Sequence, residues 1–214
     1  MGAQIERFSC VVLGAGEILD YSRVASFIAS GAFVICADGG ANHCAKLGLS
    51  PNLLVGDFDS LPGQMPPGTE RIPLCTKKNY TDSFHAAEQA QSRGHTRLLL
   101  SGMLGGRLDH TLGNLSLLAG LTKAGASALL TDGRTDVYAL AGEGELALPN
   151  REGCYFSVLA FESCCDVSIA GGKFPLENYP LSPDDPRALS NEFAGKDVRI
   201  TQKSGLLIAT SCPK

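Results

Sequence analysis

The stretch Phe8–Leu13, FSCVVL, is a short and almost continuous apolar run that ends at Gly14-Ala15-Gly16. A run of this length bounded by glycines predicts a buried β-strand followed by its turn. Apolar residues then recur at helical spacing over Tyr21–Ser30, and Gly31 closes the pattern, which predicts a helix. The chain therefore opens with a strand, a turn and a helix, the unit from which parallel sheets are assembled.

The same alternation continues through the first two-thirds of the chain. Apolar runs predict further strands over residues 33–37, 53–55, 97–101 and 128–131. Helices are predicted from Thr81, as N-cap, to residue 93, and from residue 109 to residue 123, each followed by a glycine. Strands that alternate with helices predict a mostly parallel sheet with helices on both faces.

The pattern changes near residue 135, beyond which short β-rich runs lie between turn signals. These runs cover residues 145–148, 154–160, 166–170, 198–202 and 206–210, while prolines at 180, 183 and 186 predict an irregular loop. Lys203-Ser204-Gly205 predicts a hairpin between the last two runs. We therefore predict an α/β domain over residues 1–135 and a small antiparallel β-sandwich domain over residues 136–214.

The composition excludes several classes of protein. The chain carries 18 basic and 22 acidic residues, a net charge of −4, which argues against binding nucleic acid through a basic field. Its hydrophobic content of 44% excludes a disordered chain, and no apolar run is long enough to span a membrane. No secretory signal is visible and none of the eight cysteines forms a C-x-x-C pair, so we expect a cytoplasmic protein with free thiols.

Gly56-Asp57-Phe58-Asp59-Ser60 is the strongest candidate for a site. If the backbone is extended here, Asp57 and Asp59 point the same way and Phe58 points into the core. Two adjacent carboxylates repel each other, and a hard divalent cation such as Mg²⁺ would relieve that repulsion. A solvated, aspartate-rich turn after a strand explains the same residues without a metal.

Asp38-Gly39-Gly40-Ala41-Asn42 ends the second predicted strand and opens a short helix. Ligands bind at the carboxyl ends of parallel strands, and paired glycines let backbone N–H groups approach a phosphate or a ribose. Asp38-Gly39 is also a common turn dipeptide. We favour the functional interpretation of this segment.

Lys77-Lys78-Asn79-Tyr80-Thr81-Asp82 places two ammonium groups before a capped helix. Lys78 is a candidate for holding a phosphate and Asp82 for binding a metal. In the first helical turn Asp82 also suits the helix dipole by ~0.3–1 kcal/mol, which is a sufficient structural reason for it.

Gly105-Gly106-Arg107-Leu108-Asp109-His110 follows the strand predicted over residues 97–101. Arg107 can grip a phosphate bidentately, and the two glycines leave room for it. Asp109 also fits a helix N-cap, and His110 a residue at the helix start. Each segment alone is weak evidence for a site. Because all of them follow strands of one sheet, together they indicate a single site.

Other phosphate-binding loops are missing from the sequence. Gly14-Ala15-Gly16 is followed by Leu19 where a dinucleotide fingerprint needs glycine or alanine, which disfavours a dinucleotide-dependent oxidoreductase. A non-catalytic nucleotide sensor is also disfavoured, because binding alone needs fewer aspartates. We therefore expect phosphate to be bound by an aspartate-bound metal and by lysine and arginine side chains.

Taken in order, these segments and the later Leu189-Ser190-Asn191 resemble the thiamine pyrophosphokinase family over nearly the whole chain. The resemblance implies an enzyme that transfers pyrophosphate from ATP to the hydroxyl of thiamine, giving thiamine diphosphate and AMP. It also implies a homodimer with the site at the subunit interface, and small-molecule rather than nucleic-acid or membrane partners.

The resemblance also carries roles over by position. It implies that Asp57, Asp59 and Asp82 bind Mg²⁺, with Asp38 in the same acidic cluster. Arg107 and Lys78 would contact the phosphates, Asp109 would lie beside the reacting groups, and Ser190 would bind the aminopyrimidine of thiamine. The nucleotide-binding set is completed by Gly39, Gly40, Asn42, Thr81 and His110.

Two departures from the family pattern stand out. Asn79 replaces an aspartate that members often carry after the lysine, which spares Asp82 and the expected metal site. The chain has no tryptophan, a residue that some relatives offer to thiamine. Phe174, Tyr179 and Phe193 are the candidates to stack on thiamine instead.

Overall fold

A computed structural model of the protein describes residues 7–58, 66–74 and 80–214. The described chain forms two compact units. The α/β unit contains the described residues up to Leu117 together with Gly125–Arg134, and the β unit contains Leu118–Ala124 and Thr135–Lys214. None of the helices in the described ranges has the length and apolar character needed to cross a bilayer.

The α/β unit is built on a parallel sheet. Its described strands are β1 (Phe8–Leu13), β2 (Ile28–Ala37), β3 (Leu53–Gly56), β4 (Glu70–Pro73), β5 (Arg97–Ser101) and β6 (Ser127–Thr131). They lie in the order β4-β3-β2-β1-β5-β6, and each pair of neighbours is parallel. The direction of chain progress reverses between β1 and β5, and in open α/β sheets such a switch point is where ligands bind.

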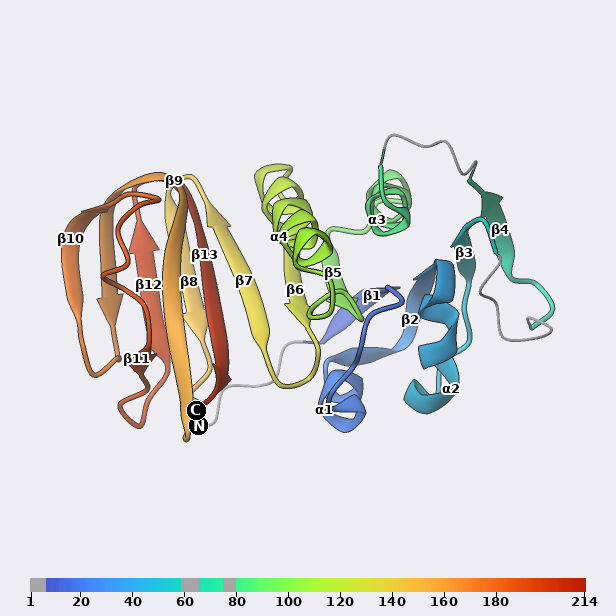
Figure 1. Cartoon of the computed structure of the whole chain (residues 1–214), viewed down its shortest axis with the longest axis horizontal. Helices are drawn as coiled ribbons and strands as arrows, with labels where there is room; N and C mark the ends of the chain where they lie inside the picture. Colours follow the sequence, from blue (N-terminus) through green and yellow to red (C-terminus); the bar gives the residue numbers. More distant parts are fainter. Residues whose placement is uncertain (1–6, 59–65, 75–79) are drawn as a thin grey trace. The chain divides into compact units, whose positions relative to one another are not determined.

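The helices of this unit are α1 (Tyr21–Ser26), the short 3₁₀ helix η1 (Asp38–His43), α2 (Cys44–Leu47), α3 (Asp82–Ser92) and α4 (Leu108–Lys123). Figure 1 shows α1 and α2 on one side of the strands, and α3 with the start of α4 on the other. Right-handed connections require this distribution when the strand order reverses. The predicted parallel strands with helices on both faces are confirmed.

The helix predicted over Tyr21–Ser30 is too long. Helix α1 ends at Ser26, and Ile28 already belongs to β2, where it pairs with Phe8. Gly31, at φ +73°, then allows the shift in register between β1 and β2. Ile28, an apolar residue at helical spacing, thus joins the sheet. Pairing with β1 satisfies its backbone groups, and helical spacing of apolar residues does not exclude a strand.

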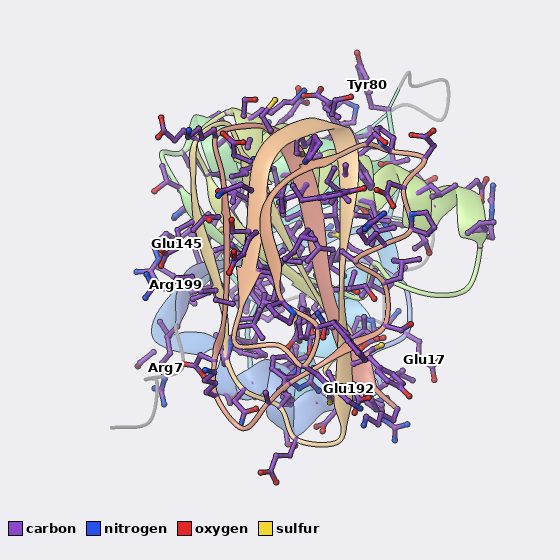
Figure 2. The ribbon with its side chains drawn as sticks, turned by 90° about the vertical axis from the view of Figure 1, so that its left-hand side faces the viewer. Arg7, Glu17, Tyr80, Glu145, Glu192 and Arg199 are labelled. Carbon is purple, nitrogen blue, oxygen red and sulfur yellow. The ribbon has the colours of Figure 1, made fainter. Side chains whose placement is uncertain are left out.

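The β unit is antiparallel throughout its described pairings. Its strands are β7 (Asp136–Ala141), β8 (Gly144–Leu148), β9 (Cys154–Ala170), β10 (Leu176–Leu181), β11 (Asn191–Glu192), β12 (Val198–Gln202) and β13 (Ser204–Pro213). The order is β7-β13-β9-β12-β8, with β10 and β11 also paired to β9. At the exposed β8 edge, Glu145 and Arg199 form an ion pair of 2.8 Å (Figure 2), and such charged edges oppose pairing with other chains.

The long strand β9 organises the β unit, and the sequence pattern divides it into two runs. Its first part pairs with β13 and β11 in one sheet, and its last part pairs with β12 and β10 in a second. Asp166, at φ +52°, lies near the passage between the two sheets. The irregular loop predicted around Pro180 is likewise wrong in part, because Pro180 belongs to β10.

The hairpin predicted at Lys203-Ser204-Gly205 is wrong. Strands β12 and β13 both pair with β9 in one antiparallel register, Thr201 with Ser168 and Ser204 with Cys165, so they follow one another along β9. The short connection stays beside β9, where the Lys203 N–H donates to the Cys165 carbonyl at 3.0 Å. Local composition predicts a turn here, but both strands pair with β9 and not with each other.

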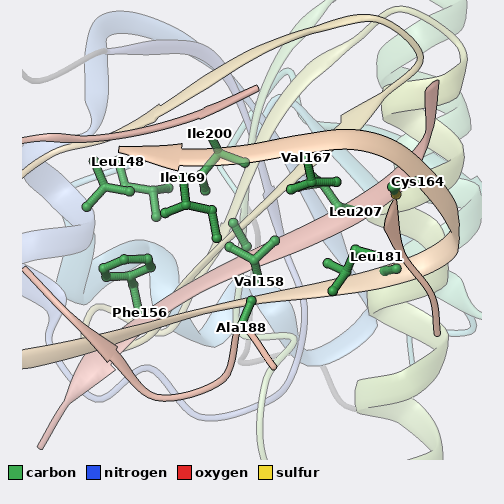
Figure 3. Packing of buried hydrophobic residues seen from close by; sticks show 13 residues of the cluster. Leu148, Phe156, Val158, Cys164, Val167, Ile169, Leu181, Ala188, Ile200 and Leu207 are labelled. Atoms are coloured by element: carbon green, nitrogen blue, oxygen red, sulfur yellow. The ribbon is translucent and has the colours of Figure 1, made fainter. Parts of the chain in front are cut away.

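Alternate residues of β9 and its neighbours fill the core of the β unit (Figure 3). The side chains of Phe156, Val158 and Ala160 share one face of β9 because strand residues alternate. The other members of this core are Leu148, Cys164, Val167, Ile169, Leu181, Ala188, Val198, Ile200, Leu207 and Ala209. This packing accounts for the near absence of exposed surface on these residues.

The cysteines in the described ranges are all free thiols, as predicted. Cys10 is buried in β1, and burial raises the pKa of its thiol to about 12. Cys36 and Cys44 contact each other with their Sγ atoms 3.5 Å apart. The buried thiols act as small apolar side chains within the sheet and beneath η1.

Gly40 is expected to be intolerant of any side chain. A Cβ at this position would lie 2.0 Å from the Leu13 carbonyl oxygen, a rigid backbone atom. Gly40→Ala should therefore destabilise the protein by about 3 kcal/mol or more, measured by urea or thermal unfolding.

Gly120→Ala is the matched control, since a Cβ there meets no atom within 4 Å. It should stabilise α4 by up to about 1 kcal/mol, because alanine favours helix. A soluble Gly40→Ala protein with the parent melting temperature would show that β1 and η1 are not in close contact.

Candidate active site

The segments predicted to bind substrate follow the carboxyl ends of β2, β3, β4 and β5 in sequence. Two backbone hydrogen bonds join the loop after β1 to the loop after β5, from Gly14 N–H to Ser101 O at 2.8 Å and from Gly16 N–H to Gly102 O at 2.7 Å. Gly102, at φ +69°, leaves no space for a Cβ beside the Gly14 carbonyl. The switch point is therefore lined by backbone, which lets a ligand approach N–H and C=O groups closely.

Asp38 begins η1 directly after β2. It adopts φ +47°, in the left-handed region that is costly for a residue with a side chain. Gly39 and Gly40 behind it are buried, and Asn42 is exposed to solvent. The short helix predicted after this strand is confirmed. It places Asp38 and Asn42 directly beyond the end of β2.

The turn after β3 lies against the turn after β2. A Cβ on Gly56 would come within 3.1 Å of the Asp38 Cα and 3.3 Å of its Cβ. Asp57, the next residue, is exposed. Asp57 therefore follows a backbone position that contacts Asp38, so these two acidic positions are brought together as predicted.

The extended backbone predicted through the Asp57 segment is wrong at Phe58. Phe58 is half-buried but adopts φ +67°, which is left-handed. A left-handed residue turns the chain sharply, so the alternation of side chains expected for a strand stops there. Asp59 lies outside the described residues, and its expected alignment with Asp57 stays a prediction.

Thr81 caps α3 as predicted. Its backbone is extended and its Oγ1 accepts a hydrogen bond from the Phe84 N–H at 3.3 Å. Asp82 is the first residue of the helix and is half-buried, in a position that suits the helix dipole. Lys78 and Asn79 lie outside the described residues, so the proposed phosphate contact of Lys78 stays a prediction.

Arg107 and Asp109 form a bidentate pair at the start of α4. Arg107 donates from Nε to Oδ1 at 3.1 Å and from a terminal nitrogen to Oδ2 at 2.6 Å. Hydrogen bonding to Arg107 lowers the pKa of the Asp109 carboxyl, and the same bonds raise the pKa of Arg107. Both groups are mostly exposed, so a phosphate can reach the guanidinium and compete with Asp109 for it.

The N-cap alternative for Asp109 is wrong, because α4 already begins at Leu108. The carboxylate instead accepts from the His110 N–H at 3.0 Å, within the first turn. His110 itself is exposed. Asn114, one turn on, is buried and donates to the Met103 carbonyl at 2.7 Å, so it fastens the loop that carries Arg107 to the helix.

The described residues contain no cluster of three or more His, Cys, Asp or Glu side chains arranged to hold a metal. The donors that are present nevertheless suit Mg²⁺, since Asp57 and Asp82 offer carboxylate oxygens and are not fully buried. Mg²⁺ is commonly bound through one or two carboxylates plus substrate phosphates rather than by a protein cage. The residues therefore fit a cation that arrives with a polyphosphate.

Ser190 and Phe174 are linked by Asn191 in the β unit. The buried Asn191 side chain accepts from the Phe174 N–H at 3.0 Å and donates to the Phe174 carbonyl at 2.7 Å. Ser190 is exposed at φ +54°, and its N–H donates to the Ser157 Oγ at 3.0 Å. Two of the residues predicted to contact thiamine, Phe174 and Ser190, thus lie next to the same buried Asn191 side chain.

The three aromatic candidates differ in how much of each ring is free. Phe174 is 59% exposed, and the Lys173 ammonium lies 5.5 Å from its ring centroid, farther than the 4.6 Å of Arg187 from the Tyr179 ring. The Tyr179 hydroxyl donates to Asp185 at 2.8 Å and its ring is covered by the Arg187 guanidinium. Phe193 packs against the core. Phe174 is therefore the ring most accessible to a ligand.

Residues 24–130 match the family model for the "Thiamin pyrophosphokinase, catalytic domain", and residues 145–207 match that for the "Thiamin pyrophosphokinase, vitamin B1 binding domain". The chain belongs to the thiamin pyrophosphokinase family. The first of these two matches contains Asp38, Asp57, Asp82 and Arg107. Ser190, like Phe174 and Asn191, falls within the second.

Known members of the family resemble this chain over most of its length. The thiamine pyrophosphokinase of Bacillus subtilis is 27% identical over 181 residues, which covers 81% of this chain and 84% of the relative. A crystal structure of thiamine pyrophosphokinase from Bacillus subtilis superposes with a TM-score of 0.84 at 24% identity, covering 96% of this chain and 99% of that one. Thiamin pyrophosphokinase from Candida albicans gives a TM-score of 0.76 at 16% identity, with 99% and 91% covered.

Thr81→Ala is expected to destabilise the start of α3. The substitution removes the Oγ1 that accepts from Phe84, and loss of such a cap costs about 1 kcal/mol. Urea unfolding and amide exchange at Phe84 report the change. Thr81→Ser keeps the acceptor and should unfold like the parent; equal loss in both variants would show that the methyl group, not the cap, matters.

Proposed function

We propose that this chain transfers the pyrophosphoryl group of ATP to the hydroxyl of thiamine in a Mg²⁺-dependent reaction. The observation that carries the proposal is the gathering of Asp38, Asp57 and the loop of Arg107 around the ends of parallel strands at the switch point. The thiamine hydroxyl oxygen attacks the β-phosphorus, and the bond from that phosphorus to the oxygen of the α-phosphate breaks. AMP leaves, and the hydroxyl proton is lost.

The chain's own residues bind and orient the nucleotide in this proposal. Arg107 exchanges the Asp109 carboxylate for phosphate oxygens, and its fork favours bidentate contact. Asp57 and Asp82, together with Asp59, hold Mg²⁺, which supplies neutralisation of negative charge on the polyphosphate. Phosphoryl transfer depends mainly on positioning and electrostatics, so this set can suffice without a covalent intermediate.

Asp38 completes the acidic cluster from the neighbouring turn, and the buried Gly39 and Gly40 bring backbone close to the nucleotide. Exposed Asn42 and His110 are positioned to add polar contacts, and Lys78 adds a cation to the phosphates. These roles follow from the resemblance to the family and from the positions of the residues after the strands. Net acidity does not oppose them, because a cation held by the carboxylates would offset their negative charge toward the phosphates.

Thiamine binding is assigned to Ser190 and Phe174. Thiamine is a cation with aromatic rings, and an exposed phenyl ring offers it stacking and cation–π contact. Asn191 holds Phe174 and follows Ser190 directly, so the hydroxyl and the ring keep a fixed spacing. The β-sandwich form that the sequence predicts for this unit agrees with its two antiparallel sheets that share β9.

The proposed assembly is a cytoplasmic homodimer with the active site at the subunit interface, as the resemblance to the family implies. The division of the predicted residues supports this arrangement, since the nucleotide residues belong to the α/β unit and the thiamine residues to the β unit. Light scattering after size exclusion reports the oligomeric state directly.

The deciding experiment incubates the protein with ATP, Mg²⁺ and thiamine and separates the products by chromatography. Equal amounts of AMP and thiamine diphosphate support the proposal. ADP with thiamine monophosphate would indicate a different kinase, and ATP bound but unconsumed would indicate a nucleotide sensor. Omission of Mg²⁺, with EDTA present, should abolish turnover.

Asp57→Asn is expected to reduce turnover by at least about 100-fold while leaving the fold intact, because an amide binds Mg²⁺ far less well than a carboxylate. The measurement is kcat with saturating Mg²⁺, alongside the melting temperature. Asp184→Asn, which removes a carboxylate from an exposed loop of the β unit, is the control and should keep parent activity. Near-normal turnover of Asp57→Asn would remove Asp57 from the metal site.

Phe174→Ala and Ser190→Ala are expected to raise the KM for thiamine about tenfold, equivalent to about 1.4 kcal/mol, and to leave the KM for ATP unchanged. Phe174→Tyr keeps the ring and should behave like the parent. Equal effects on both substrates would exclude these residues from the thiamine site.

A further inference from the structure

His43 is a buried histidine whose side chain bonds two other segments of the α/β unit. It ends η1 and is 9% exposed. Its Nε2 lies 2.9 Å from the Gly16 carbonyl oxygen, in the loop after β1, and its Nδ1 lies 2.7 Å from the Tyr21 hydroxyl, at the start of α1. Both ring nitrogens are therefore used, although the ring is remote in sequence from either partner.

The partners of His43 determine its tautomer. A carbonyl oxygen only accepts hydrogen bonds, so Nε2 must carry the proton and donate to Gly16. In the neutral ring Nδ1 is then an acceptor, and the Tyr21 hydroxyl donates to it. Burial lowers the pKa of His43, and the nearby Lys46, whose ammonium lies over the Tyr21 ring, lowers it further. The neutral ring with Nε2–H is therefore the form present near pH 7.

The same contacts join three strand-end loops in one chain of hydrogen bonds. His43 belongs to η1, after β2, and bonds the Gly16 carbonyl after β1. The Gly16 N–H donates in turn to the Gly102 carbonyl after β5. Asp38 lies five residues before His43 on η1, and Arg107 lies five residues after Gly102, so the linked loops carry the acidic and basic residues assigned to the nucleotide.

We propose that His43 is a positioning residue for pyrophosphoryl transfer, whose neutral Nε2–H form, set by the Gly16 carbonyl and supported by the Tyr21 hydroxyl, holds the loops after β1, β2 and β5 in register for the nucleotide triphosphate. The proposal rests on the function proposed above. His43 does not contact substrate in it, and its effect is exerted through the backbone of Gly16. Loss of the two His43 hydrogen bonds should weaken ATP binding and leave thiamine binding unchanged.

Three variants separate the two hydrogen bonds. His43→Leu removes both and leaves the Gly16 carbonyl without its donor. His43→Gln retains an N–H donor near the place of Nε2, and Tyr21→Phe removes only the hydroxyl that donates to Nδ1. His95→Leu is the control, because His95 precedes β5 and stacks on Phe33, away from the carboxyl ends of the strands.

The kinetic experiment measures KM for ATP and for thiamine, and kcat, at fixed Mg²⁺. His43→Leu should raise the KM for ATP about tenfold, Tyr21→Phe two- to threefold, and His43→Gln should restore most of the loss. The KM for thiamine should stay within about twofold of the parent value in every variant, and His95→Leu should match the parent in both. An unchanged KM for ATP in the folded His43 variants, with only the melting temperature lowered, would overturn the proposal.

Two measurements do not depend on turnover. Nitrogen-15 NMR of the histidine rings should show His43 as the Nε2–H tautomer at pH 7, and Tyr21→Phe should weaken that preference; a predominant Nδ1–H form would overturn the proposal. Calorimetric titration with ATP and Mg²⁺ should show the tenfold loss of affinity in His43→Leu, and parent affinity there would contradict it. If the parent binds ATP but forms no thiamine diphosphate, the proposed function fails while these results still decide the role of His43.

Discussion

Close contact between backbones at the carboxyl ends of β1, β2 and β5 is the constraint on which the α/β unit depends. Gly40 lies against the Leu13 carbonyl and Gly102 against the Gly14 carbonyl, at separations that exclude a Cβ. The strand-end loops are consequently held by one another rather than by large side chains. Asp38 and Arg107 lie on two of these loops, so the backbone contacts place their side chains at the strand ends, where their chemistry can serve a ligand.

Much of the fold follows from local sequence where a segment is buried on both sides. The strands over Phe8–Leu13 and Arg97–Ser101 have the predicted bounds, because continuous apolar runs ended by glycine fit few other structures. Local pattern fails where a distant partner decides. Ile28 suits a helix and a strand equally, and only pairing with Phe8 selects the strand. The connection at Lys203 has hairpin composition, yet the strands that it joins follow one another along β9 and do not pair with each other.

The candidate site shows the same division. Residue types and their order after the strands predict which side chains gather, and the contact of Gly56 with Asp38 agrees with that prediction. Backbone handedness is not visible in the sequence, so the left-handed Phe58 is missed. His43 is missed for a different reason: it directly follows the predicted Asp38–Asn42 segment, but its partners lie 22 and 27 residues away and share no local motif with it. The available signal was a histidine directly after such a segment, where the chain continues into a short helix.

The β unit depends on its final strand in a way that the strand order makes explicit. Strand β13 lies between β7 and β9 and pairs with both, so the strand that follows all the other described strands in sequence occupies the middle of the sheet. Until Ser204–Pro213 has been synthesised, β7 and the first part of β9 each present an unpaired edge in water. The β unit can therefore complete its folding only after β13 has been synthesised, whereas the α/β unit, whose described strands all precede Arg134, can form its sheet earlier in synthesis.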